Sequence, residues 1–239
     1  MKKYIIALVI SFFFSAQLKA QVTMAYKKTD RDTNIIVYDE QGNALRYYQY
    51  SKLVNSGDYT IRYNGRPGEP GVRAHLLKLD DTDRARILFI VKERMSIKSD
   101  KVKEGNALDL KPLKDALDGV DFTKKVLVLV FWDSGCPLCT ESFAGINDFF
   151  MQVPNAQDVI LIALSSDDKE TAMATLKQTP LLNAQQITNS SNINKDYDII
   201  TVPAYIVADK DHIIRLALSG QSPVTLTAIK AAVTSALAQ

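Results

Sequence analysis

Cys136 and Cys139 are the residues of this 239-residue chain best suited to chemistry, and they are its only cysteines. Two residues, Pro137 and Leu138, separate them, and the pair follows an apolar run and a short polar turn. A chain of this length buries enough apolar surface to fold without a disulfide. The pair is therefore interpreted as a site of thiol–disulfide chemistry rather than as a structural crosslink.

The start of a predicted helix at the cysteine pair gives the two thiols different roles. Unpaired N–H groups and the positive end of the helix dipole favour a thiolate at Cys136. Pro137 suits the first helical position, where its missing N–H is not needed. Residues 139, 143, 146, 150 and 153 are Cys, Phe, Ile, Phe and Val, with the spacing of a core-facing stripe. We expect an exposed Cys136 that attacks and a buried Cys139 that resolves.

The second half of the chain predicts an α/β domain, because continuous apolar runs alternate with amphipathic segments. The predicted strands are residues 126–131, 159–164, 204–208 and 213–218. The predicted helices are residues 136–153, 169–178 and 225–237. This order indicates a mixed central sheet flanked by helices. His212 is expected to be an exposed turn residue between the last two strands.

The preceding part of the chain predicts a small β-rich N-terminal module. Its predicted strands are residues 34–38, 45–50, 59–63, 72–79 and 87–91, taken to form an antiparallel unit. Residues 64–71 hold three Gly and two Pro, which excludes a regular element there. The charged stretch at residues 92–106 is interpreted as a linker.

The first 20 residues have the features of a secretory signal peptide. Lys2 and Lys3 precede an apolar run at residues 4–14, and small and polar residues lead to Ala20. Cleavage is predicted after Ala20, with Ala16 as the alternative. An uncleaved membrane anchor is disfavoured because a spanning helix needs about 20 apolar residues. The predicted divisions are therefore residues 1–20, 21–104 and 105–239, in a protein exported to the periplasm.

Three segments together resemble the TlpA/ResA branch of periplasmic thioredoxin-like proteins. They are FWDSGCPLC at residues 131–139, VILIALSSDD at 159–168 and YDIITVPAYIVADKD at 197–211. The resemblance covers roughly residues 105–239 and implies a thioredoxin-like central sheet. It also implies that Pro203 is cis and packs beside the cysteine pair. A reductase that draws electrons from a membrane-bound redox partner is the activity it favours.

Further site residues follow from the resemblance. Trp132 either faces substrate, which its place beside the cysteines favours, or belongs to the core. Val202 and Pro203 are expected to shape the site with Pro137. The chain departs from its relatives at four positions: Gly135 replaces an aromatic residue, Val130 a buried Asp, Ser142 a Glu, and Val202 the more frequent Thr. The group that accepts the proton of Cys139 is therefore left open.

Other functions have weaker support. A formal net charge of +2 gives no reason to expect nucleic acid as partner. Zinc is disfavoured because the two histidines, His75 and His212, lack ligand spacing from the cysteines. Copper delivery by the related C-x-x-x-C proteins needs one more residue between the cysteines and a histidine partner. A peroxidase of the peroxiredoxin type needs Pro and Thr where Leu129 and Asp133 stand.

The favoured interpretation is thus an oxidoreductase that acts on protein thiols and disulfides. Its redox-active disulfide is the pair itself, and no metal or other cofactor is expected. The alternative is a non-catalytic binding module with a vestigial disulfide. Reduction potential separates the two, since inert structural disulfides lie below about −300 mV.

Overall fold

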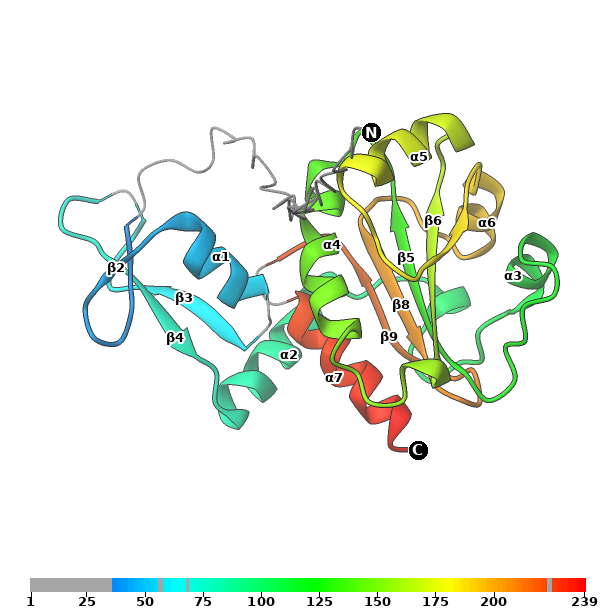
Figure 1. The fold of residues 1–239 in the computed structure, drawn as a ribbon. Helices are drawn as coiled ribbons and strands as arrows, with labels where there is room; N and C mark the ends of the chain where they lie inside the picture. Colours follow the sequence, from blue (N-terminus) through cyan, green and yellow to red (C-terminus); the bar gives the residue numbers. More distant parts are fainter. Residues whose placement is uncertain (1–35, 56–57, 68, 223–224) are drawn as a thin grey trace, which may run out of the picture. The chain divides into compact units, whose positions relative to one another are not determined.

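The computed structural model describes residues 36–55, 58–67, 69–222 and 225–239. These residues form a four-stranded sheet with strand order β2-β1-β4-β3 and a five-stranded sheet with order β7-β6-β5-β8-β9 (Figure 1). The predicted signal peptide lies outside the described residues, as does the start of the strand predicted from residue 34. Within the described part of the chain, no helix is both long and apolar enough to cross a membrane.

The five-stranded sheet is mixed, as predicted. Its strands are β5 (Val126–Trp132), β6 (Val159–Ser165), β7 (Gln185–Ile187), β8 (Ala204–Ala208) and β9 (Ile214–Ser219). Strand β5 pairs in parallel with β6 on one side and antiparallel with β8 on the other. Every residue of β5 is buried, which explains its continuous apolar sequence.

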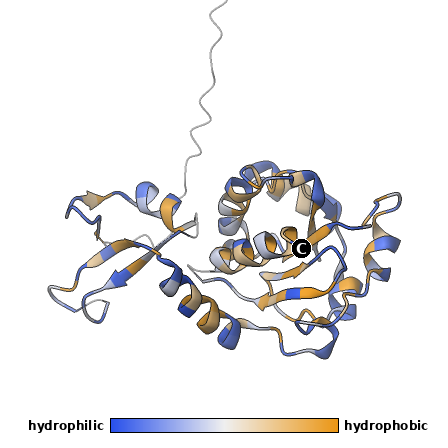
Figure 2. Cartoon of the chain, turned by 90° about the horizontal axis from the view of Figure 1, so that it is seen from below, coloured by the Kyte–Doolittle hydropathy of each residue, from blue (hydrophilic) through white to orange (hydrophobic). Residues whose placement is uncertain are grey.

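Helices cover both faces of this sheet. They include α3 (Lys111–Ala116), α4 (Pro137–Phe150), α5 (Lys169–Gln178), α6 (Ser191–Asp196) and α7 (Thr225–Leu237). Val128 and Val130 of β5 pack in one hydrophobic cluster with α4, α5 and α7, while Leu129 packs in a second cluster with α3 and α6. Hydrophobic residues run through the strands between these layers (Figure 2). The predicted thioredoxin-like α/β fold is confirmed.

Several predicted elements have the observed bounds. Helices α5 and α7 and strand β8 begin and end at the predicted residues. Helix α4 begins one residue later than predicted, because Cys136 is its N-cap, and it ends at Phe150 instead of residue 153. The sequence reasoning missed α3, β7 and α6, which are three to six residues long and too short to show a period.

The N-terminal module differs from the antiparallel unit that was predicted. It contains β1 (Val37–Tyr38), β2 (Ala44–Leu45), α1 (Tyr47–Asn55), β3 (Tyr59–Tyr63) and β4 (Ala74–Lys78). Strand β1 runs parallel to β4, so this sheet is mixed. The strand predicted at residues 45–50 is wrong, because Tyr47 begins a helix. The rings of Tyr47 and Tyr50 meet edge to face at 5.3 Å, as neighbours three apart on a helix do.

The strand predicted at residues 87–91 is also wrong, since it lies within helix α2 (Asp81–Met95). The Asp80 side chain caps this helix by accepting from the Asp83 N–H at 2.7 Å. Val91 is buried, and Ile87, four residues earlier, packs against the same cluster. A short apolar run does not by itself distinguish a strand from a buried helix face.

Residues 92–106 do not form the free linker that their charge suggested. After α2 ends, the Ile97 N–H donates to the Ala217 carbonyl at 3.0 Å. Further along, the Gly105 N–H donates to the Ile214 carbonyl at 2.8 Å. These bonds attach the stretch to β9 of the large sheet. The division of the chain at residue 104 stays a prediction.

Candidate active site around the cysteine pair

The cysteine pair lies where β5 ends and α4 begins. The turn between them is closed by the Cys136 N–H, which donates to the Asp133 carbonyl at 3.0 Å. Cys136 then occupies the N-cap of α4 with extended backbone, and its Sγ accepts from the Cys139 N–H at 3.2 Å. The two sulfur atoms form a disulfide. This places one sulfur atom at the helix N-terminus, where an anion is stabilised.

The two cysteines differ in burial. Cys139 has no exposed surface and packs in the cluster that contains Phe143 and Ile146 of α4. Cys136 is half-buried, which makes it less exposed than the sequence suggested. Pro137 occupies the first turn of α4, as expected, and is exposed. The burial fits an attacking Cys136 and a resolving Cys139, but these roles stay predictions.

Trp132 is a core residue in position. Only 1 % of its surface is exposed, and its ring meets that of Phe143 edge to face at 5.4 Å. This burial favours the core alternative for Trp132. Whether the residue contacts substrate or only shapes the site stays a prediction.

The Val202–Pro203 peptide bond is cis, as predicted. Pro203 is buried, whereas Val202 is half-buried and packs against the hydrophobic cluster that includes both cysteines. Ile200 precedes them with 93 % of its surface exposed. An apolar side chain therefore faces solvent two residues before Val202, a feature that sequence reasoning missed.

The positions that depart from relatives are now placed. Val130 is buried in the cluster with Cys139, and a Cβ added at Gly135 would meet no atom within 4 Å. Ser142 stands on α4, where its hydroxyl donates to the Cys139 carbonyl at 2.6 Å. The residue in place of the Glu of relatives thus bonds the backbone of the buried cysteine.

Tyr205 of β8 is a second hydroxyl residue in this cluster, and sequence reasoning missed it. Its side chain is fully buried, and its hydroxyl donates to Oε1 of Gln221 at 2.9 Å. Burial raises the pKa of Tyr205 to about 12, while a hydrogen bond with Ser142 opposes that rise. Its apolar surroundings are those of an inward-facing strand residue, which the buried run at 204–208 could have indicated.

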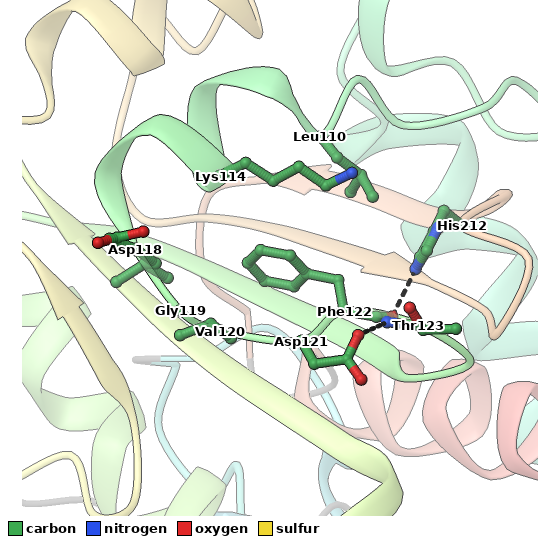
Figure 3. A pocket seen from close by; sticks show the side chains of 10 residues that line it. Leu110, Lys114, Asp118, Gly119, Val120, Asp121, Phe122, Thr123 and His212 are labelled. Atoms are coloured by element: carbon green, nitrogen blue, oxygen red, sulfur yellow. Dashed lines mark hydrogen bonds between the residues drawn. The ribbon is translucent and has the colours of Figure 1, made fainter.

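A polar hollow of about 310 Å³ lies at the opposite end of β5, beside the loop that precedes the strand (Figure 3). Lys114, Asp118 and His212 line it. His212 has left-handed backbone (φ 61°), and its Nε2 lies 2.9 Å from the Phe122 carbonyl oxygen. It is half-buried, so the expectation of a simply exposed turn residue is corrected. Neither cysteine lines this hollow.

Part of the chain is similar to known proteins. The family described as AhpC/TSA matches residues 107–217. A Chlorobium tepidum protein assigned as a thiol:disulfide interchange protein DsbE is 24 % identical, with a TM-score of 0.47; the match covers 59 % of this chain and 99 % of that one. A thiol-disulfide oxidoreductase from Bacteroides fragilis is 23 % identical, with a TM-score of 0.41, over 48 % of this chain and 85 % of that one. StoA from Bacillus subtilis is 22 % identical, with a TM-score of 0.40, over 46 % of this chain and 84 % of that one.

No curated protein sequence matches the chain. The family match and the mixed five-stranded sheet confirm the resemblance to thioredoxin-like proteins. The function is argued from this chain's own residues.

Proposed function

We propose that this chain is an exported thiol–disulfide oxidoreductase that acts as a reductase of protein disulfides. The observation that carries the proposal is the disulfide between Cys136 and Cys139 at the N-terminus of α4. One of its sulfur atoms belongs to a half-buried residue, and the other to a residue with no exposed surface. That asymmetry suits a two-step exchange better than a structural crosslink.

The exchange begins with the reduced pair. The Cys136 thiolate attacks one sulfur of a substrate disulfide, which breaks that bond and releases a substrate thiolate. The product is a mixed disulfide between Cys136 and the substrate. The Cys139 thiolate then attacks Cys136 Sγ, which frees the second substrate thiolate and restores the intramolecular disulfide. Two electrons pass to the substrate.

The geometry at the start of α4 supports Cys136 as the attacking residue. Its Sγ already accepts the Cys139 N–H at 3.2 Å, and the first turn of a helix offers further unpaired N–H groups. Charge-assisted bonds of this kind stabilise a thiolate. Cys139, surrounded by apolar side chains, has its access limited to the sulfur of Cys136.

The direction of electron flow and the location are part of the proposal. A reductase must be re-reduced by a dithiol, and the resemblance favours a membrane-bound redox protein as the donor. The disulfide itself is the only redox group required, with no metal or other cofactor. A reduction potential near the thioredoxin value of about −270 mV would support a reductase, and one near the DsbA value of about −120 mV would refute it.

Trapping tests the exchange directly. Replacing Cys139 with Ser removes the resolving thiol, so substrate proteins should remain disulfide-bonded to Cys136 and be recovered under non-reducing conditions. The matched control, Cys136→Ser, keeps one cysteine but should trap nothing. Equal trapping by the two variants would refute the assigned roles.

The alternative, a non-catalytic module with a vestigial disulfide, predicts different measurements. Its disulfide would resist reduction, with a potential below about −300 mV, and neither variant would capture partners. Export is tested separately by mass spectrometry of protein from the native cell. The chain should begin at or near Gln21, and recovery of Met1 in the membrane fraction would contradict cleavage.

A further inference from the structure

Two turns at the same edge of the large sheet are bonded to each other reciprocally. Trp132 and Ser165 are paired at the ends of the parallel strands β5 and β6. Beyond them, the Ser166 N–H donates to Oδ1 of Asp133 at 2.8 Å, and the Ser134 N–H donates to Oδ2 of Asp167 at 2.6 Å. Each carboxylate therefore binds the backbone of the other turn.

The Ser165 hydroxyl lies between the two carboxylates. It is 3.0 Å from Oδ2 of Asp167 and 3.4 Å from Oδ1 of Asp133, and it accepts from the Asp167 N–H at 3.2 Å. Ser165 is 1 % exposed, whereas both aspartates are half-buried. Asp133, Ser165 and Asp167 are together called the carboxylate clasp.

The β6 side of the clasp is held by its own hydrogen bonds. The Ser190 N–H donates to the Ser165 carbonyl at 2.9 Å, and the Asn189 N–H to the Asp167 carbonyl at 2.8 Å. The Asn194 side chain of α6 donates to the Ser166 hydroxyl at 3.1 Å. The turn after β6 is therefore held in place by several hydrogen bonds, and the cysteine turn is bonded to it.

The cysteine turn is closed by a backbone bond to Asp133. The Cys136 N–H donates to the Asp133 carbonyl at 3.0 Å. Asp133 therefore accepts this bond through its backbone carbonyl and belongs to the clasp through its side chain. A displacement of Asp133 would move Cys136 away from the N-terminus of α4, where its thiolate is stabilised.

We propose that Asp133 and Asp167 are positioning residues that hold Cys136 at the N-cap of α4 and so sustain its reactivity. The inference deepens the proposed function and rests on it. Whether the substitutions speed or slow the reaction of Cys136 is informative, because the negative charge of a nearby carboxylate disfavours a thiolate. Loss of charge alone should therefore speed the reaction of Cys136, whereas loss of position should slow it.

A pair of substitutions separates these effects. Asp167→Asn and Asp167→Ala both lack the charge, but only Asn keeps an oxygen that can accept from the Ser134 N–H. In the reduced full-length protein at neutral pH, alkylation of Cys136 by iodoacetamide should be roughly fivefold slower in the Ala variant than in the Asn variant, as expected for one net hydrogen bond. Equal rates would overturn the inference.

Asp168→Ala is the matched control. Asp168 follows Asp167 directly, but its carboxylate caps α5 by accepting from the Thr171 N–H at 2.9 Å. This variant should lose some stability and keep the wild-type alkylation rate. A slowing equal to that of Asp167→Ala would show that any damage to this turn affects Cys136, which would overturn a specific role of the clasp.

Reciprocity supplies a second test. If the clasp acts as one unit, the combined Asp133→Ala and Asp167→Ala protein should react no more than about twofold slower than the slower single variant, since contacting residues are not additive. If the double variant is slowed by the product of the two single-variant factors, the two aspartates act independently and the clasp is not one unit. Should Asp167→Ala fail to fold, Asp133→Ala and Asp133→Asn make the same comparison from the other turn.

Failure of this inference is distinguishable from failure of the proposed function. Alkylation requires no protein substrate, so it reports on Cys136 even if Cys139→Ser traps nothing. Absence of trapping with a fivefold difference between Ala and Asn would refute the reductase alone. Trapping with equal alkylation rates would refute the clasp alone.

Discussion

The two ends of β5 offer a comparison between a cavity and a reactive group. The loop before the strand borders the polar hollow of about 310 Å³, with Lys114 and His212 in its wall (Figure 3). The turn after the strand carries Cys136 at a helix N-terminus. Neither cysteine lines the hollow, and within the described residues no three His, Cys, Asp or Glu are grouped so that they could hold a metal ion. This hollow and the cysteine pair therefore lie at opposite ends of β5.

The difference follows from the direction of the strands. Helix α4 starts at the carboxyl end of β5, so its unpaired N–H groups point to the turn that holds the cysteines. At the other end, the strand is entered from a loop, and the polar groups bond to one another. The Lys124 ammonium, for example, lies 2.6 Å from Oδ1 of Asp211, which raises the pKa of Lys124. We therefore predict that substitutions at the cysteine end of β5 remove activity, whereas substitutions at the other end lower stability.

The largest effect should be the difference in turnover between a substitution at the cysteine end of β5 and one at the hollow. Cys136→Ser removes the attacking sulfur and should abolish reduction of a protein disulfide in a coupled assay. His212→Ala, at the hollow, should keep turnover within about twofold of wild type, because His212 lies at the opposite end of β5 from the cysteines and neither cysteine lines the hollow. Loss of turnover in His212→Ala, with the fold retained, would reverse the roles of the two ends.

Truncation should have the next largest effect, on stability. A chain beginning at Asp80 keeps α2, whose Val91 is buried against the large sheet. A chain beginning at Lys103 loses α2 and the Ile97 bond to β9, and should unfold with a free energy lower by about 3 kcal/mol or more, given the apolar surface exposed. Urea unfolding of both chains measures this difference. Equal stabilities would support a domain boundary at residue 104.

A smaller effect is expected from the backbone at His212. Its left-handed conformation is tolerated by Asn better than by Ala, and both substitutions remove the ring contact with the Phe122 carbonyl. His212→Ala should therefore lower the free energy of unfolding by about 1–2 kcal/mol, and His212→Asn by less. Chemical denaturation compares the two, and identical losses would show that the backbone conformation contributes nothing.

The smallest effect at neutral pH concerns Tyr205, near the cysteine end. Its pKa is about 12 in the folded protein, compared with about 10 for a tyrosine in an unfolded chain. The unfolded chain loses this proton first, so the stabilisation is complete below about pH 10 and is lost as pH rises toward 12. Tyr205→Phe should weaken this alkaline decline in unfolding experiments. An unchanged decline would contradict the raised pKa.

The cysteine pair and most of the elements that position it could be predicted from local patterns in the sequence. A cysteine pair between a continuous apolar run and an amphipathic stripe predicts a strand, a turn and a helix, and β5 and α4 lie there. The bounds of α5 and α7 were predicted as well. These segments are long enough for their period to be read locally, and local chemistry also supplied Pro137 at the first helical turn.

Contacts between distant segments could not be predicted in this way. The apolar run at residues 87–91 fits a strand or a helix, and packing against the large sheet makes it a helix. The charge of residues 92–106 hid their attachment to β9, because those bonds are made by backbone groups. Trp132 next to the cysteines seemed suited to substrate, yet β5 is covered on both faces, so the Trp132 side chain is buried against Phe143.

The carboxylate clasp is the clearest example of a feature that the sequence could not predict. Asp133 and Asp167 are ordinary turn residues in the sequence, and nothing in either turn indicates the other. They are brought together because β5 and β6 pair in parallel with Trp132 opposite Ser165. A shift of this register by one residue would exchange the faces of the strand and separate the two carboxylates. Register is a property of the assembled sheet, which is why the clasp could be found only in the structure.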